Sequence, residues 1–465
     1  MVEKKSKPLF HSKLYQAVFI LSKNQKNDLL AFMKMPSNGL SEHDQQMMKA
    51  FLNKMDIFRD GAREEAFWEK QLKDTRTQKK HVMNRLLKAL ERYLALNALE
   101  QNAPLYYTLL AAFYSEKGIG KNAAFCIRKA RKLVNAPKNR NLEEGLIEYR
   151  LYELEAHQAR NKREPSRNLE FMETALKRFY CVHQMRILGE QANRQHIIRE
   201  NHDALAATAQ YCQGDTEELI VYRWLFIMVN DNDRTAYQQL NTFMQKNEDF
   251  FSSKFQKEII EALMNFCVRY VNMGEKQYAE DYLTFIELLD KKGLLLEGGL
   301  LPIHRFPNCL LIAILLGRLE WARAFFAKYG SKLLAPKEFK RQPFLDFYQA
   351  IIELYDGHPQ TGMKLLGRFQ TSDMYLKDAY YKIASDKMLL MFFYQQEDFS
   401  PILARIDSLK KYIWENIKLA PSRKAPHLAF LKILRQLANH KQVAWVTQKD
   451  QLFPMDYLWL ERILL

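Results

Sequence analysis

A glycine followed five residues later by an alanine recurs along this chain, and this spacing constrains the fold more than any other feature. Each of these glycines ends an apolar helical stretch, and a large apolar residue follows it nine positions later. The pairs are Gly118 with Ala123, Gly274 with Ala279, and Gly317 with Ala322. Two closely packed antiparallel helices need such a small residue at a fixed distance after the turn. Repetition at about 40 residues is typical of helix pairs stacked into a solenoid.

Composition supports the same class of fold. The 465 residues include only 16 glycines and 14 prolines, which favours long helices over many short strands. No segment shows the sustained alternation of a strand. Weaker copies of the spacing begin at Asp231, Gly357 and Gln395, where the small residues are Ala236, Gly362 and Ser400. The sequence therefore predicts an all-α fold, an α-solenoid of antiparallel helix pairs.

We expect four regions along the chain. Residues 1–10 form a basic tail, residues 11–100 an N-terminal helical cap or subdomain, residues 101–420 the helical repeats, and residues 421–465 the C-terminal capping helices. Ser22 and Ser41 begin helices of the second region with capping patterns. Pro421–Pro426 is interpreted as a break between helices. The apolar segment 457–465 is expected to pack as a final helix.

The residues around the first repeat resemble a tetratricopeptide unit. That family places large, small and aromatic residues on a first helix, a glycine in the turn, and alanines around a large residue on the second helix. The matching positions are Tyr107, Leu110, Ala111, Tyr114, Gly118, Ala123, Ile127 and Ala130. The units are longer than the family's usual ~34 residues, so the resemblance is to divergent, TPR-like units. It implies a curved surface that holds a peptide or a helical segment of a partner protein.

A second resemblance concerns the segment LSKNQKNDLLAFMKMPSN, residues 21–38. It is similar to the opening of a group of uncharacterised bacterial helical proteins. This resemblance implies relatives and a bacterial origin, but it implies no activity.

Cysteine usage and hydropathy indicate where such a chain works. The five cysteines are scattered, form no CxxC pair and are flanked by apolar helical sequence, so we expect buried small side chains in a reducing compartment. The longest apolar run, residues 309–316, is too short to span a bilayer. We expect a cytoplasmic protein that does not associate with membranes.

Charge is distributed unevenly and marks one candidate surface. Net charge is +7 for residues 1–100, +7 for 101–200, −7 for 201–300 and +9 for 301–465. At 100° per residue, the predicted helix after Gly118 places apolar residues on one side and a basic face on the other. The candidate contact residues are Lys121, Arg128, Lys129, Arg131 and Lys132, with Arg160, Lys162 and Arg163 nearby. This face either contacts phosphates or an acidic partner, or is simply a solvated outer surface. Aromatic residues at helical spacing are interpreted as core.

No sequence motif indicates chemistry. Phosphate loops, dinucleotide fingerprints, nucleophile elbows and zinc-protease motifs are absent from the sequence. Glu153/His157 and His196/Glu200 lie one helical turn apart, but each pair offers at most two ligands. The run Asp231–Asp233 is interpreted as a helix cap rather than a cation site. We therefore expect no catalytic residue, no cofactor and no metal.

These features favour a non-enzymatic scaffold that binds a peptide or helical segment of a protein partner. The partner's identity and the oligomeric state are left open. One alternative is nucleic-acid binding through the basic N-terminal half. Another is self-assembly into a structural protein, in which basic and acidic regions of different copies meet.

Overall fold

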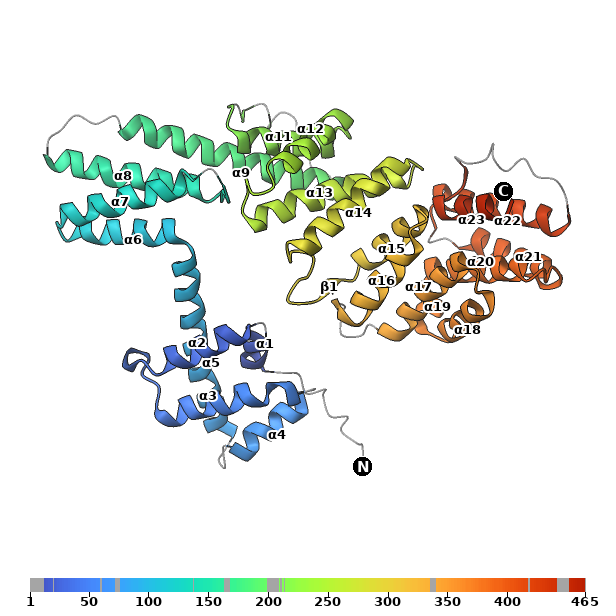
Figure 1. Cartoon of the computed structure of the whole chain (residues 1–465), viewed down its shortest axis with the longest axis horizontal. Helices are drawn as coiled ribbons and strands as arrows, with labels where there is room; N and C mark the ends of the chain where they lie inside the picture. The colour runs from blue at the N-terminus through green and yellow to red at the C-terminus, as the bar shows by residue number, and fades with distance from the viewer. Residues whose placement is uncertain are drawn as a thin grey trace. The chain divides into compact units, whose positions relative to one another are not determined.

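A computed structural model describes residues 12–19, 21–58, 61–71, 76–136, 138–162, 168–198, 209, 211–212, 214–334, 340–416, 419–440 and 451–464. It divides the chain into two compact units, Met1–Tyr180 and Cys181–Leu465, called here the N-terminal and C-terminal units. The described residues form 22 α-helices, three short 3₁₀ helices and one small sheet, so the predicted all-α fold is confirmed (Figure 1). The expected tail, residues 1–10, lies outside the described part of the chain.

The N-terminal unit begins with five helices around one apolar core. Ser22 starts the second helix with the predicted capping box, in which its side chain and that of Gln25 bond each other's backbone N–H. Phe51, Phe67 and Trp68 are buried at the centre of this core. The helices are α1 (Lys13–Phe19), α2 (Lys23–Met33), α3 (Glu42–Lys54), α4 (Gly61–Gln71) and α5 (Arg76–Gln101), with 3₁₀ turns at Pro36–Asn38 and Met55–Ile57.

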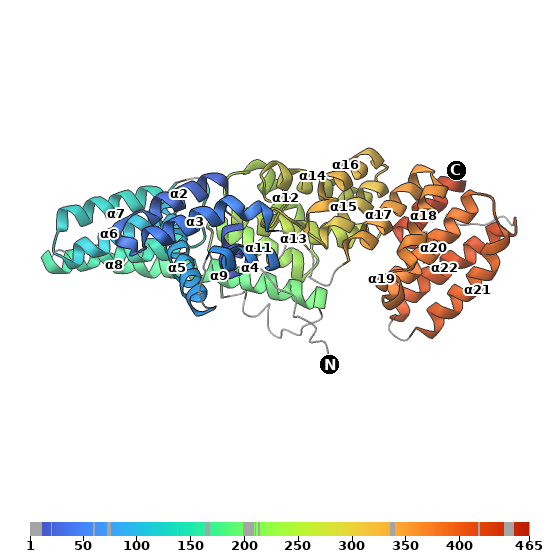
Figure 2. The ribbon, with the colours of Figure 1, turned by 90° about the horizontal axis from the view of Figure 1, so that it is seen from below.

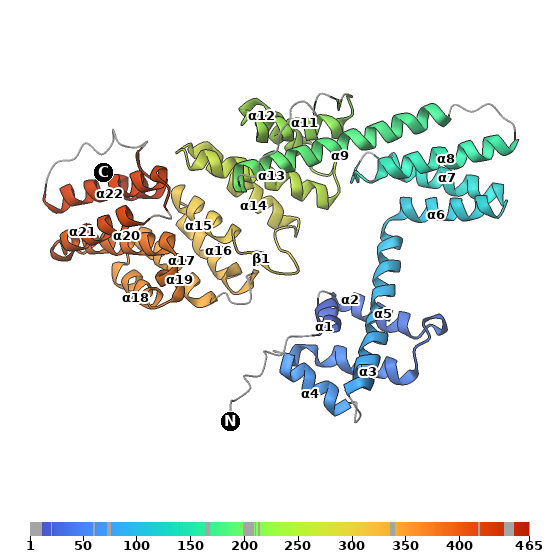
Figure 3. The ribbon, with the colours of Figure 1, turned by 180° about the vertical axis from the view of Figure 1, so that it is seen from behind.

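Three further helices of this unit pack together around a second core. They are α6 (Ala103–Glu116), α7 (Gly120–Val134) and α8 (Glu144–Lys162), which lie side by side in Figure 3. Ala111, Cys126, Ala130 and Leu151 are buried between them. The long helix α9 (Asn168–Ile198) runs across the boundary between the units.

In the C-terminal unit, consecutive helices pack as pairs, and each pair contacts the next one along the chain (Figure 2). The pairs are α11 (Glu217–Asn230) with α12 (Arg234–Lys246), α13 (Ser253–Val271) with α14 (Lys276–Lys291), α15 (Arg305–Leu315) with α16 (Leu319–Tyr329), and α17 (Arg341–Asp356) with α18 (Pro359–Gln370). The short α19 (Asp373–Lys377) precedes α20 (Ala379–Gln395), α21 (Ser400–Glu415), α22 (Pro421–Ala438) and α23 (Pro454–Leu464). A 3₁₀ turn lies at Gly330–Lys332, and β1 (Leu301–Pro302) pairs in parallel with β2 (Leu333–Leu334).

The recurring glycines form one kind of helix-ending turn. Gly118, Gly274, Gly317 and Gly357 have φ values of 71°, 87°, 72° and 82°, in the left-handed region. The N–H of the residue after each glycine donates to the carbonyl five residues earlier, at 2.8–3.1 Å. This is the bonding pattern of a Schellman motif, which glycine adopts without a steric penalty. The predicted role of these glycines is therefore confirmed.

The small residues after the turns are buried where helices approach closely. Ala123, Ala279 and Ala322 are each fully buried. At Gly362, a Cβ atom would overlap the Phe392 ring, so even alanine does not fit there without movement of that ring. The weak copy beginning at Gln395 is wrong at Ser400, which is exposed.

Several other predictions can be compared with the structure. Asp233 caps α12 by accepting a bond from the Ala236 N–H at 2.6 Å, as expected. All five cysteines are buried and free.

The break expected at Pro421–Pro426 is wrong, because α22 starts at Pro421 and continues through Pro426. Burial of Phe430 and other apolar residues in the following turns offsets the bond lost at this proline. Among the helices that the structure describes, none combines the length and apolar character required to cross a bilayer.

Candidate functional site

The predicted basic face lies on α7. Lys121, Arg128 and Lys132 are exposed and lie within one strip of the helix, because their positions differ by little on a 100° helical projection. Ala123, Cys126, Ile127 and Ala130 are buried on the opposite side. These positions agree with the separation of basic and apolar sides that the sequence predicts.

The other basic residues differ in their surroundings. Arg131 is half-buried, pairs with Glu155 at 2.8 Å and covers the Tyr152 ring at 4.3 Å. Arg131 is therefore engaged within the unit. Arg160 is exposed near the end of α8, and the side chain of Lys162, the last residue of that helix, is not described. Arg163 lies outside the described residues.

Some aromatic side chains of α6 and α7 are exposed, contrary to the expectation that aromatic residues at helical spacing form core. Phe125 lies on the strip itself and is 53% exposed, and Phe113 on α6 is 52% exposed. Lys129 Nζ lies 5.2 Å from the centroid of the Tyr107 ring and 6.0 Å from that of the Phe125 ring. The sequence spacing of these aromatic residues does not distinguish exposed positions from core positions. They are exposed because the three helices α6–α8 are too few to cover every aromatic side chain of the group.

A second candidate site is a cavity of about 500 Å³ in the C-terminal unit. It lies against α13, α15 and α17, each of which begins one of the helix pairs described above, and against α20, α22 and α23. Its size falls in the range of ligand sites. Because α17 contacts both α15 and α20, side chains from several helix pairs line a single cavity.

The cavity walls are mainly apolar. Helix α20 turns Tyr380, Ala384, Met388 and Met391 toward the cavity, at the spacing of one helical face. Other apolar lining residues are Val268, Val271, Leu311, Ile312, Leu315, Phe347, Ile351, Leu354, Leu419 and Phe453. Met388 and Met391 have flexible, polarizable side chains, which make this apolar wall adaptable.

One polar cluster interrupts these walls. The buried Lys387 Nζ donates to Asp456 and lies 3.4 Å from His427 Nδ1. Burial and the charges of Lys387 and Arg423 lower the pKa of His427 to about 3, so its imidazole is neutral at physiological pH. Burial raises the pKa of Asp456, although the Lys387 charge and hydrogen bond act against this rise. Arg423 is exposed at the rim of the cavity.

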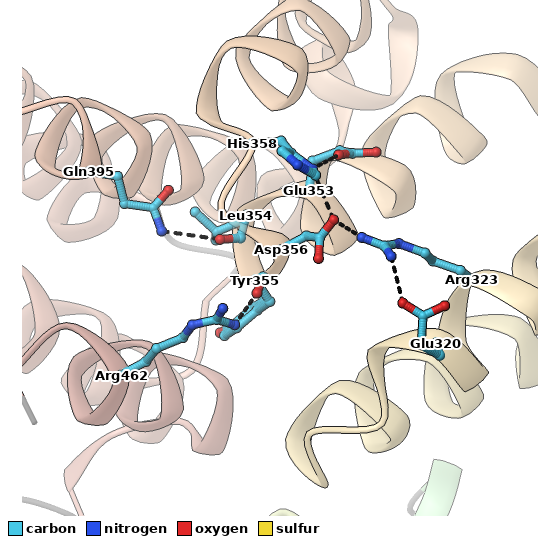
Figure 4. Close-up of polar contacts among 9 residues, drawn as sticks. All are labelled: Glu320, Arg323, Glu353, Leu354, Tyr355, Asp356, His358, Gln395 and Arg462. Carbon is cyan, nitrogen blue, oxygen red and sulfur yellow. Dashed lines mark hydrogen bonds and ion pairs between the residues drawn. The ribbon is translucent and has the colours of Figure 1, made fainter.

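The C-terminal helix α23 holds one side of the cavity in place. Its residue Trp459 is fully buried, against the rings of Tyr394 and Phe430. The Tyr355 hydroxyl donates to the Met455 carbonyl at 2.7 Å. Arg462 donates to the Tyr355 carbonyl, as Figure 4 shows. Segment 457–465 was predicted to pack as a final helix, and α23 confirms this for the residues described.

Sequence reasoning did not predict the cavity or its polar cluster. Lys387, His427 and Asp456 belong to three helices and share no motif. The available signal was Asp456 near the start of a mainly apolar terminal helix, because a buried carboxylate needs a cation beside it. Comparison of the chain with protein-family models, curated proteins and solved structures finds no match.

Proposed function

We propose that this chain is a non-enzymatic scaffold, an α-solenoid of TPR-like helix pairs, which holds a segment of a partner protein in the cavity of its C-terminal unit. The observation that carries the proposal is the lining of this cavity by α13, α15 and α17, the first helices of three successive pairs, together with α20. Solenoids generally bind partners along such a surface, because each repeat adds a strip of side chains to it.

The chemistry of the cavity supports an apolar segment that carries an acidic residue. Apolar walls contact apolar side chains, and Arg423 at the rim can pair with a carboxylate. Inside the cavity, Lys387 and Asp456 already neutralise each other. A helical segment with apolar residues on one side and an acidic residue at one end fits these surroundings.

Filling the cavity tests this proposal. Ala384 is half-buried in the lining, so Ala384→Trp occupies the space that a partner side chain would use. The matched control is Ala404→Trp on α21, at an exposed position outside the lining. Tagged wild-type protein and both variants are purified from native lysate after nuclease treatment, and bound proteins are quantified by mass spectrometry.

We expect a stoichiometric partner with wild type and Ala404→Trp, and at least tenfold less of it with Ala384→Trp. Equal recovery with the two variants would exclude this cavity as the binding site. If wild type retains no stoichiometric protein after nuclease treatment, the scaffold proposal itself is wrong.

A second candidate function is binding of single-stranded nucleic acid by the basic face of α7. The observation that favours it is the exposure of Phe125 within the strip formed by Lys121, Arg128 and Lys132. Cations that follow a phosphate backbone, with an aromatic ring on which a base can stack, are the parts that such binding uses.

For this candidate we expect affinity for a single-stranded oligonucleotide to fall steeply with salt. Changing Lys121, Arg128 and Lys132 to glutamate should reduce the slope of log K against log salt by about 2, since each phosphate contact contributes about 0.7. Arg131 is left unchanged because it pairs with Glu155. The control changes Lys246, Lys364 and Lys410, which are exposed elsewhere, to glutamate. Equal loss in both triple variants would reject the basic face as the site.

A further inference from the structure

The turn between α17 and α18 brings three metal-ligating side chains together. Glu353 and Asp356 lie in the last turn of α17, and His358 follows Gly357, whose φ of 82° reverses the chain. His358 Nδ1 lies 3.1 Å from Glu353 Oε2 and 2.9 Å from Asp356 Oδ2 (Figure 4). In the part of the chain that the structure describes, this is the one group of three such residues whose ligand atoms all lie within 4.8 Å of one another.

We propose that Glu353, Asp356 and His358 form a zinc-binding site. Imidazole nitrogen and carboxylate oxygen bind Zn²⁺ at about 2.0–2.2 Å, and tetrahedral ligands at such distances lie about 3.3 Å apart. The two distances from His358 Nδ1 are only a few tenths of an ångström shorter. Small side-chain rotations therefore admit the ion between the three groups. The site does not depend on the proposed scaffold function.

Electrostatics of the turn also favour a divalent cation. Arg323 on α16 pairs with Asp356 and, at 2.8 Å, with Glu320. The carboxylates of Glu320, Glu353 and Asp356 and the Arg323 guanidinium together carry a net charge of −2, which Zn²⁺ would neutralise. Glu353 and Asp356 also lie at the C-terminal end of α17, where the helix dipole disfavours negative charge and favours a cation.

Exposure indicates the type of site. The side chains of Glu353 and Asp356 are 16% and 18% exposed, whereas that of His358 is 58% exposed. The carboxylates are thus held within the fold. Arg323 contacts the same Oδ2 of Asp356 that faces His358, so the ion would share this oxygen with the guanidinium or bind Oδ1 instead. Because His358 is exposed, we expect water or a side chain of another molecule to supply a fourth ligand. Bound zinc would clamp the α17–α18 turn and, through Arg323, connect it to α16.

The test is calorimetric titration of the chelator-treated full-length chain with ZnCl₂. We expect the wild-type chain to bind one equivalent of zinc. His358→Gln and Glu353→Gln should each lose this binding or bind zinc at least tenfold more weakly. The control is His43→Gln, which removes an exposed imidazole on α3. Zinc should raise the thermal unfolding midpoint of wild type and His43→Gln, but not that of either site variant.

Other results would overturn the assignment. One is zinc binding by both site variants with the same stoichiometry and affinity as the wild type. Another is binding of Mg²⁺ or Ca²⁺ as tight as that of Zn²⁺, because oxygen-preferring ions would not require the imidazole. Circular dichroism of each variant verifies that loss of binding is not loss of fold.

Discussion

At the scale of single residues, His427 shows how burial changes the chemistry of a side chain. It lies beside Lys387 and Arg423, and its pKa falls to about 3 because of burial and these two charges. Asp456, which accepts from Lys387, has a pKa shifted in the opposite direction. The cluster therefore holds one neutral imidazole and one ion pair in apolar surroundings. This arrangement fixes α20, α22 and α23 around the cavity.

The depressed pKa of His427 predicts a specific pH dependence of stability. The unfolded chain binds this proton near the ordinary pKa of about 6.5, whereas the folded chain binds it only near 3. The stabilising contribution is therefore complete above about pH 6.5 and falls as the pH decreases toward 3. Between pH 7 and pH 5 we expect a loss of about 2 kcal/mol in wild type that is absent from His427→Gln. Both proteins keep Asp456, whose opposite effect cancels in the comparison.

Urea denaturation of the two proteins at pH 7 and pH 5 measures this difference. Parallel losses of stability in wild type and His427→Gln would mean that His427 is protonated in the folded protein at pH 5.

At the scale of elements, the turn glycines decide where one helix ends and the next begins. Sequence spacing predicted these turns at Gly118, Gly274 and Gly317 because a left-handed residue has a strong local preference for glycine. The turn near Gln395 was placed wrongly, because Glu397 adopts the left-handed conformation there without being glycine, with φ of 59°. Such a residue leaves no compositional signal.

We expect Gly317→Ala and Gly367→Ala to change stability in opposite directions. Gly317 has φ of 72°, where a Cβ atom costs about 1–2 kcal/mol. Gly367 lies within α18, and a Cβ atom there meets nothing within 4 Å, so alanine should stabilise this helix by about 1 kcal/mol. Urea midpoints of both variants measure the effects. A Gly317→Ala midpoint equal to or above that of wild type would contradict the account of the turn.

At the scale of the whole molecule, local patterns predicted the class of fold, and contacts between distant residues supplied the candidate sites. The all-α class followed from glycine spacing and composition, and the buried alanines followed from the same repeat. The division between Tyr180 and Cys181 lies within a continuous helix and has no signal in the sequence. The cluster at His358 has no signal at the spacing of one helical turn, because the chain reversal at Gly357 brings together Glu353 and His358, which are five residues apart.

The basic face illustrates the same limit. A helical projection predicted which residues of α7 point outward, because that depends on one helix alone. It could not predict that Arg131 pairs with Glu155 or that Phe125 is exposed. Both depend on how much of α7 its neighbours α6 and α8 cover.

Site-specific photo-crosslinking tests the central proposal, partner binding in the cavity, most directly. A photoreactive phenylalanine analogue is placed at position 384 in the cavity lining and, as a control, at the exposed position 404. We expect a single protein adduct at 384, mapped by mass spectrometry to one apolar segment that carries an acidic residue, and no such adduct at 404. No protein adduct at 384, or the same adduct at both positions, would contradict binding in this cavity.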